Sequence, residues 1–292
     1  MRWEDQRQSS NIDDRRMQRG SRFGGFRGRN LASALPIAKF LLKSKIGRIV
    51  LIVGVVAYFL GFNPLDLLNP GSQNVAKVNS QQDNQTAKFV SVVLAKTEDI
   101  WGKIFKQYGS TYEKPVLVLF RGSTQSGCGY ASRQTGPFYC PSDHKIYLDL
   151  SFFEELKSRH NSPGDFAQAY VIAHEIGHHI QNLSGTLDKI HQKQKALSKS
   201  RANTLQVGVE LQADCYAGVW AYYMKNEYGL LESGDIEEAL NAANAIGDDT
   251  LQKQAQGYVV PDSFTHGSSS QRMEWFKKGY QNGDIRACNS IR

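Results

Sequence analysis

Apolar residues recur at helical spacing along much of the chain after Ala87, and at strand spacing in two short runs. In residues 88–109 they fall on one face of a helix that Gly109 ends. The runs 115–120 and 145–150 are apolar or alternating and are bounded by polar turns, which predicts two strands. Further helices are expected over residues 162–185, 210–224, 236–246 and 270–280. The pattern predicts an α+β domain, mostly helical with a small sheet, that starts near Ala87.

A different pattern occurs earlier, where residues 49–62 contain no charged side chain. With its apolar flanks the run extends over residues 46–68, which is long enough for a transmembrane helix. The basic residues that precede the uncharged stretch 49–62 are Lys39, Lys43, Lys45 and Arg48. Basic flanks favour the cytoplasm, so the N-terminus is expected inside the cell and the later residues outside it. The long preceding region and the lack of an A-x-A site favour an uncleaved anchor over a cleaved signal peptide; a buried core helix is the other alternative.

These segments divide the chain into four parts. Residues 1–45 are expected to form a basic, Gly/Arg-rich cytoplasmic segment, residues 46–68 a transmembrane signal anchor, and residues 87–292 the folded domain. Residues 69–86 are rich in Asn, Gln and Ser and lack aromatic residues, as in a flexible stalk. The folded domain is thus expected outside the cytoplasm, tethered to the membrane.

Most of the net charge lies at the beginning of the chain. The formal net charge is +7, but residues 1–62 hold twelve Lys or Arg against four Asp or Glu, and the remaining residues hold 23 basic and 24 acidic side chains. The folded domain is close to neutral, so no nucleic-acid partner is expected. The Arg/Gly-rich stretch 22–29 leaves RNA binding as an alternative, although membrane topology and contact with anionic lipids account for it better.

Four cysteines permit three pairings. We favour Cys128 with Cys140, which closes a glycine-containing loop, and Cys215 with Cys288, which ties the C-terminal tail to the helix expected over residues 210–224. Two bridges fit an oxidising compartment, and four unpaired buried thiols are the alternative. The sequence has no C-x-x-C spacing, so a structural zinc site made of cysteines is not expected.

The most specific motif is H-E-x-x-H, formed by His174, Glu175 and His178 within an expected helix. Residues four apart lie one turn above each other, so the two imidazoles can bind one metal ion. Glu175 is rotated by about 100° from His174, which allows its carboxylate to act as a general base on metal-bound water. The alternative is a surface helix that carries these polar residues by chance.

A catalytic zinc site needs a third protein ligand and an open fourth position. The best candidate is Glu210, which begins an apolar helical stretch downstream. Asp214 follows one turn later on the same face, where it can accept a hydrogen bond from the far N–H of a ligating imidazole. Alone, this pair would be an ordinary solvated helix face.

Together these motifs resemble the gluzincin metallopeptidases, in which H-E-x-x-H is followed by E-x-x-x-D on a later helix. A closer resemblance, to the bacterial neutral zinc metallopeptidase family of the YpfJ type, covers nearly the whole chain. It is carried by residues 1–16, 127–153, 171–185, 210–221 and 264–276. It implies a membrane-anchored zinc peptidase of the bacterial inner membrane with one catalytic Zn²⁺. The implied zinc ligands are His174, His178 and Glu210, and the implied catalytic carboxylate is Glu175.

Peptide hydrolysis also needs a donor that stabilises the oxyanion. Our first choice is His266, in a motif similar to the Thr-His-Pro with a downstream Arg of the HtpX type of gluzincin, although Gly267 stands where Pro is usual. Arg272 would then support the loop. His266 could instead reach zinc in a resting form or be a capping or core residue, and Tyr258 is a rival donor.

The sequence therefore predicts a membrane-anchored zinc metallopeptidase with a peptide or protein substrate and the lipid bilayer as partners. The alternative is a zinc-holding or metal-free scaffold or chaperone of the cell envelope, and the intact Glu175 argues against it. The sequence leaves open the substrate, the choice between endopeptidase and exopeptidase, and the oligomeric state.

Overall fold

The structure, a computed structural model, describes residues 1–17, 80–158 and 162–291. They contain a four-stranded sheet in the order β1-β2-β6-β5, formed by Ile12–Asp14, Val116–Phe120, Lys145–Asp149 and Phe138–Cys140. β1, β2 and β6 are parallel to one another, and β5 is antiparallel to β6. β2 and β6 are the two strands expected from the sequence.

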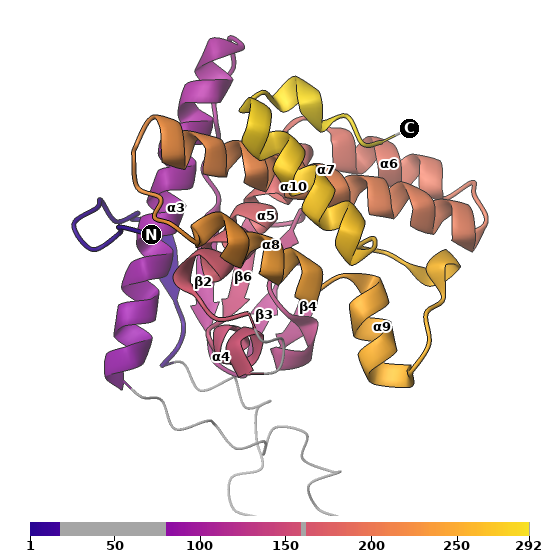
Figure 1. Cartoon of the computed structure of the whole chain (residues 1–292), viewed down its shortest axis with the longest axis horizontal. Helices are drawn as coiled ribbons and strands as arrows, with labels where there is room; N and C mark the ends of the chain where they lie inside the picture. The colour runs from indigo at the N-terminus through magenta and orange to yellow at the C-terminus, as the bar shows by residue number, and fades with distance from the viewer. Residues whose placement is uncertain (18–79, 159–161, 292) are drawn as a thin grey trace, which may run out of the picture. The chain divides into compact units, whose positions relative to one another are not determined.

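Helices make up most of the rest. They are α3 (Ser80–Gln107), α4 (Ser151–Ser158), α5 (Asp165–Leu183), α6 (Thr186–Gln194), α7 (Lys199–Asn226), α8 (Asp235–Ala245), α9 (Asp248–Gln256) and α10 (Ser269–Asn282). A hairpin of β3 (Ser123–Ser126) and β4 (Gly129–Ser132) completes the domain (Figure 1). The expected α+β class, mostly helical with a small sheet, is confirmed. The hairpin, β5 and α9 were not expected, because their short runs carry little periodicity.

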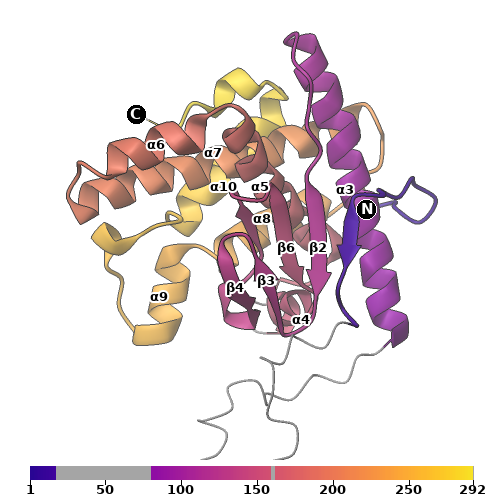
Figure 2. The same cartoon turned by 180° about the vertical axis from the view of Figure 1, so that it is seen from behind.

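The two faces of the sheet pack against different cores because side chains alternate along a strand. In β2, Leu117 and Leu119 belong to the large core, which includes buried residues of α3, α5, α7 and α8. Val118 and Phe120 lie in a smaller cluster with Ala131 of β4. Figure 2 shows the β3–β4 hairpin on the side of the sheet opposite α5. One face of the sheet therefore supports α5, and the hairpin covers the other face of the sheet.

The N-terminal segment, residues 1–17, belongs to this folded domain, which corrects the expectation of a separate segment over residues 1–45. β1 lies beside β2 at the edge of the sheet, with Ile12 paired to Leu117 (Figure 2). The apolar pattern misses this segment because polar contacts hold most of it. The best example is Glu98 of α3, which accepts hydrogen bonds from Ser9 and Asn11.

The expected start of the domain near Ala87 is also too late, since α3 begins at Ser80 and includes residues 80–86 of the expected stalk. The expected anchor, 46–68, and the first part of the stalk lie outside the described residues. Within the described ranges, no helix combines the length and apolar character that a membrane crossing requires.

The backbones of α7 and α10 approach each other closely at small residues. A Cβ atom on Gly279 of α10 would collide with the carbonyl oxygen of Cys215, and one on Gly218 of α7 with that of Phe276. A disulfide between Cys215 and Cys288 joins α7 to the 3₁₀ turn, Ile285–Cys288, that follows α10. This packing fixes α10 beside α7, the helix that carries Glu210 and Asp214.

Gly279→Ala is expected to destabilise the protein by about 1–3 kcal/mol, because the backbone of α7 cannot move aside for the added methyl group. Gly102→Ala on α3 is the matched control. No atom lies within 4 Å of its added Cβ, so it should stabilise the protein by roughly 0.5–1 kcal/mol. Urea unfolding measures the free energy of unfolding of both variants. A change of the same sign in both would contradict the close packing of α7 and α10.

Candidate metal centre

His174 and His178 lie one turn apart on α5, and their ring centroids are 4.8 Å apart. α5 is buried over most of its length because it packs between the sheet and α7. Gly177 permits this approach, since a Cβ atom there would lie 2.8 Å from the Cα atom of Ala213 on α7. The close contact brings a third residue, Glu210 of α7, to the two imidazoles.

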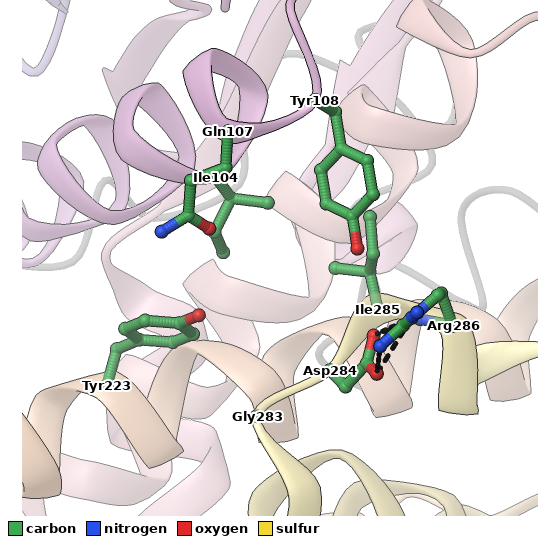
Figure 3. A pocket seen from close by; sticks show the side chains of 8 residues that line it. All are labelled: Ile104, Gln107, Tyr108, Tyr223, Gly283, Asp284, Ile285 and Arg286. Atoms are coloured by element: carbon green, nitrogen blue, oxygen red, sulfur yellow. Dashed lines mark hydrogen bonds and ion pairs between the residues drawn. The ribbon is translucent and has the colours of Figure 1, made fainter.

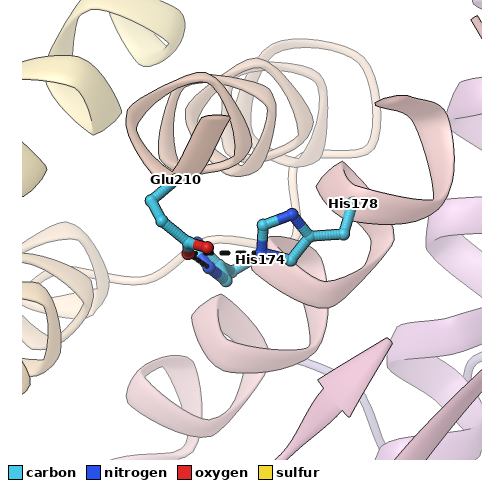
Figure 4. A group of neighbouring side chains, drawn as sticks. All are labelled: His174, His178 and Glu210. Atoms are coloured by element: carbon cyan, nitrogen blue, oxygen red, sulfur yellow. Dashed lines mark hydrogen bonds and ion pairs between the residues drawn. The ribbon is translucent and has the colours of Figure 1, made fainter. Parts of the chain in front are cut away.

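The Glu210 carboxylate points at both imidazoles (Figure 4). Its Oε2 atom is 3.2 Å from Nε2 of His174 and 3.3 Å from Nε2 of His178. One ligand atom from each of the three residues lies within 4.8 Å of the others. Two imidazole nitrogens and one carboxylate oxygen form a three-ligand set suited to catalytic zinc.

The His174 ring is oriented by Asp214, as the spacing of Glu210 and Asp214 suggested. Nδ1–H of His174 donates to Oδ1 of Asp214 at 2.7 Å. Asp214 is fully buried and also accepts hydrogen bonds from Tyr170 at 2.6 Å and from two nitrogens of Arg272 at 2.9 Å. With its proton on Nδ1, His174 keeps the lone pair of Nε2 for a metal.

The His178 ring is oriented by Gln181, a residue that the sequence interpretation missed. Nδ1–H of His178 donates to Oε1 of Gln181 at 2.8 Å. The amide orientation of Gln181 is fixed because its nitrogen donates to the carbonyl oxygen of Val209 at 2.7 Å and to Gln212 at 3.1 Å. A helix places residues three apart side by side, and this spacing could have revealed Gln181. Both Nε2 atoms are therefore available on the side that faces Glu210.

Charge also fits a divalent cation. Burial alone would lower the pKa of His174, but the charge of Asp214 and hydrogen bonds raise it to about 9. Burial opposes ionisation of Glu210, yet its contacts with His178 and His174 hold its pKa well below the usual range. Glu175, Glu210 and Asp214 are all buried at or beside this site, and the guanidinium of Arg272 pairs with Asp214. The excess of negative groups favours a bound Zn²⁺.

Glu175 follows His174 on α5 and is 7% exposed. Burial lowers the pKa of His178, but Glu210 raises it above its usual value, and the charge of Glu175 adds to this rise. The residue therefore lies close enough to the candidate ligands to influence them electrostatically.

His266 lies in the loop between α9 and α10. The adjacent Gly267 packs close to Leu211, the residue after Glu210. Asp248 holds the loop by accepting the backbone N–H of His266 at 2.7 Å, and its other oxygen lies 3.2 Å from Nδ1 of His266. The His266 side chain is 53% exposed, so it is not a core residue. Gly267 has φ +95°, which proline cannot adopt, and this accounts for the departure from Thr-His-Pro.

Arg272 has a different position from the one expected. It is buried and binds Asp214, Tyr170 and the carbonyl oxygen of Ile246. It therefore supports the carboxylate that orients His174. Tyr258, the rival oxyanion donor, is 62% exposed.

Both expected disulfides are present. Cys128–Cys140 joins the β3–β4 turn to β5, and Cys215–Cys288 joins α7 to the 3₁₀ turn Ile285–Cys288. A surface pocket of about 180 Å³ is lined by Tyr108, Tyr223 and Arg286 among others (Figure 3). None of its lining residues is a candidate ligand.

An H-E-x-x-H helix packed against a second helix that supplies Glu210 and Asp214 is the arrangement of the gluzincin class. The chain belongs to the family described as "Putative neutral zinc metallopeptidase", which it matches over residues 1–291. It is 48% identical to the uncharacterized protein YpfJ of Escherichia coli K12 over 294 residues, covering 100% of this chain and 99% of that protein. It is 43% identical to the uncharacterized protein Rv2575 of Mycobacterium tuberculosis H37Rv over 214 residues, 70% of this chain and 71% of that protein. No solved structure matches the chain.

Asp214→Asn is expected to weaken zinc binding by about 10–100-fold, because an amide holds the His174 imidazole less strongly than a carboxylate does. Competition with a chromogenic chelator measures the change, with circular dichroism to establish that the variant is folded. Asp188→Asn, on the exposed face of α6, is the control and should leave the affinity unchanged. If Asp214→Asn binds zinc as tightly as the Asp188→Asn control, Asp214 serves only to neutralise Arg272.

Proposed function

We propose that this protein is a zinc-dependent metallopeptidase that cleaves peptide bonds with an activated water molecule. The observation that carries the proposal is the convergence of three ligand atoms, Nε2 of His174, Nε2 of His178 and Oε2 of Glu210, with both Nδ1 atoms held by acceptors. A zinc ion bound there would polarise a peptide carbonyl and lower the pKa of a water molecule. Membership of a zinc metallopeptidase family supports the same chemistry.

Glu175 is the proposed general base. It would take a proton from the attacking water and pass it to the leaving amine. Asp214, held by Arg272, would keep His174 in the tautomer that binds the metal through Nε2. His266 is the proposed donor to the developing oxyanion, since its loop packs beside α7 near Glu210 and its imidazole is half exposed.

β5 is the proposed site for the substrate backbone. It is one of the two edge strands of the sheet, and no described strand pairs with its free edge. Tyr139 of β5 contacts His179 of α5, with 3.0 Å between the Tyr139 hydroxyl and Nδ1 of His179. The free edge thus belongs to a strand beside the metal helix, and a peptide could add to it as a further strand.

The proposed place of action is the bacterial cell envelope, at the inner membrane. The two disulfides support an oxidising compartment. The proposed membrane attachment is the uncharged run within residues 46–68.

Metal analysis combined with a peptide-library assay tests the proposal. The purified protein should contain about one zinc per chain and should cleave peptides until a chelator removes the metal. His174→Ala should lose both properties, whereas His191→Ala, on the exposed face of α6, should lose neither. Full zinc occupancy without any cleavage would instead support a scaffold, and zinc retention by His174→Ala would refute the ligand assignment.

A further inference from the structure

β1 is an integral strand of the sheet and not a loosely attached tail. Asp13 pairs with Val118 and Asp14 with Leu119 in parallel register. The backbone N–H of Leu117 donates to the carbonyl oxygen of Asn11 at 2.9 Å, and that of Arg15 donates to Leu119 at 2.7 Å. Hydrogen bonds to β2 at both ends of β1 fix its position in the sheet.

The residues before β1 also satisfy a buried charge. The Glu98 side chain on α3 is 1% exposed. It accepts hydrogen bonds from Ser9, from Asn11 at 2.7 Å and from Arg7 at 3.1 Å. Besides these partners it has Lys114, whose Nζ lies 3.4 Å away. A buried carboxylate is costly unless it is paired, so α3 is built to receive this segment.

Two further contacts extend the attachment along α3. Ser9 and Ser91 exchange two hydrogen bonds, each of 3.0 Å. The backbone N–H of Ser9 donates to the carbonyl oxygen of Ser91, and the Ser91 hydroxyl donates to the carbonyl oxygen of Ser9. The rings of Trp3 and Phe89 meet edge to face at 5.4 Å. The segment therefore touches the domain along its length and not at one point.

We propose that residues 1–17 lie on the same side of the membrane as the metal-binding domain. A single crossing between residues 17 and 80 would separate β1 from β2 by a hydrocarbon layer of about 30 Å, whereas the two strands are directly hydrogen-bonded. Residues 17 and 80 therefore lie in one compartment. Because both disulfides lie in this domain, that compartment is the oxidising one.

The proposal goes beyond the peptidase function and competes with the single-pass arrangement that the basic residues before the apolar run suggest. The charge rule treats residues 1–45 as a tail free to stay in the cytoplasm. The strand pairing gives residues 1–17 a fixed place in the domain, and this constraint outweighs the charge pattern because a paired strand cannot be shared across a bilayer.

Thiol labelling of the full-length protein in spheroplasts tests the proposal. Cysteines would be placed singly at Ser10 and at Ser200, both exposed, and the native cysteines are all paired. A membrane-impermeant maleimide should modify both positions equally before lysis, while a cytoplasmic marker protein stays unmodified. Labelling of Ser200→Cys alone before lysis would overturn the shared side, and labelling of both only after lysis would overturn the oxidising compartment.

A disulfide trap gives a second measurement that does not depend on reagent access. Ser9→Cys with Ser91→Cys should form a bond in the membrane-bound protein, because the two residues are in contact. A protease site inserted within residues 18–79 then allows the chain to be cut between the two cysteines. The two fragments should separate on a reducing gel but stay linked on a non-reducing gel. Ser9→Cys with Ser200→Cys is the control pair and should not link. If the Ser9→Cys and Ser91→Cys pair forms no disulfide and Ser10→Cys is not labelled before lysis, the proposal is rejected. This holds whether or not the protein is a peptidase.

Discussion

Glu175→Gln is expected to retain about one zinc per chain and to reduce kcat for peptide hydrolysis by about 10²–10⁴-fold. The amide has nearly the shape of the carboxylate but cannot accept the proton of the attacking water. Zinc content should persist because the metal-binding atoms come from His174, His178 and Glu210. Metal analysis and steady-state kinetics on the same preparation measure both quantities.

Glu237→Gln, on the exposed face of α8, is the matched control and should change neither zinc content nor kcat. Activity at the wild-type level in Glu175→Gln would refute the general-base assignment. Loss of zinc in the same variant would place Glu175 among the ligands. These two outcomes separate an error in the mechanism from an error in the metal site.

The candidate ligands could be predicted from the sequence because helical spacing places the residues of each motif on one face of its helix. His174 and His178 are four residues apart, and so are Glu210 and Asp214, so each pair shares a helix face wherever the helices pack. The sequence could not show how the two helices approach. That depends on small residues at the contact, such as Gly177 against Ala213, and on the hydrogen bond between His174 and Asp214.

The parts that could not be predicted depend on contacts between residues far apart in the chain. Arg272 seemed to belong to the His266 loop by proximity in sequence, but α10 packs so that its guanidinium reaches Asp214. β1 is three residues long and largely polar, so it has no periodic signal of its own. Its place in the sheet depends on β2 and on the buried Glu98, both about a hundred residues later.

A protein that begins at Ser80 is expected to be about 3–5 kcal/mol less stable than one that keeps residues 1–17, because it loses the pairing of β1 with β2 and three side chains that donate hydrogen bonds to the Glu98 carboxylate. The fair comparison is a chain in which a flexible Gly/Ser linker replaces residues 18–79, since both proteins then lack the apolar run. For a domain of this size the difference corresponds to roughly 6–20 °C in Tm. It is also a large part of the about 5–15 kcal/mol that stabilises a typical domain.

Thermal unfolding of the two proteins, both loaded with zinc, measures this difference. A synthetic peptide of residues 1–17 should raise the Tm of the shortened protein. The same peptide with Ser9→Ala and Asn11→Ala should raise it less, because these two residues donate hydrogen bonds to Glu98. Equal Tm values for the shortened and the linked protein would mean that β1 adds nothing to the fold, and the shared compartment would then lose its physical basis. A large difference that only the native peptide reverses would show that the beginning of the chain completes the domain that holds the metal site.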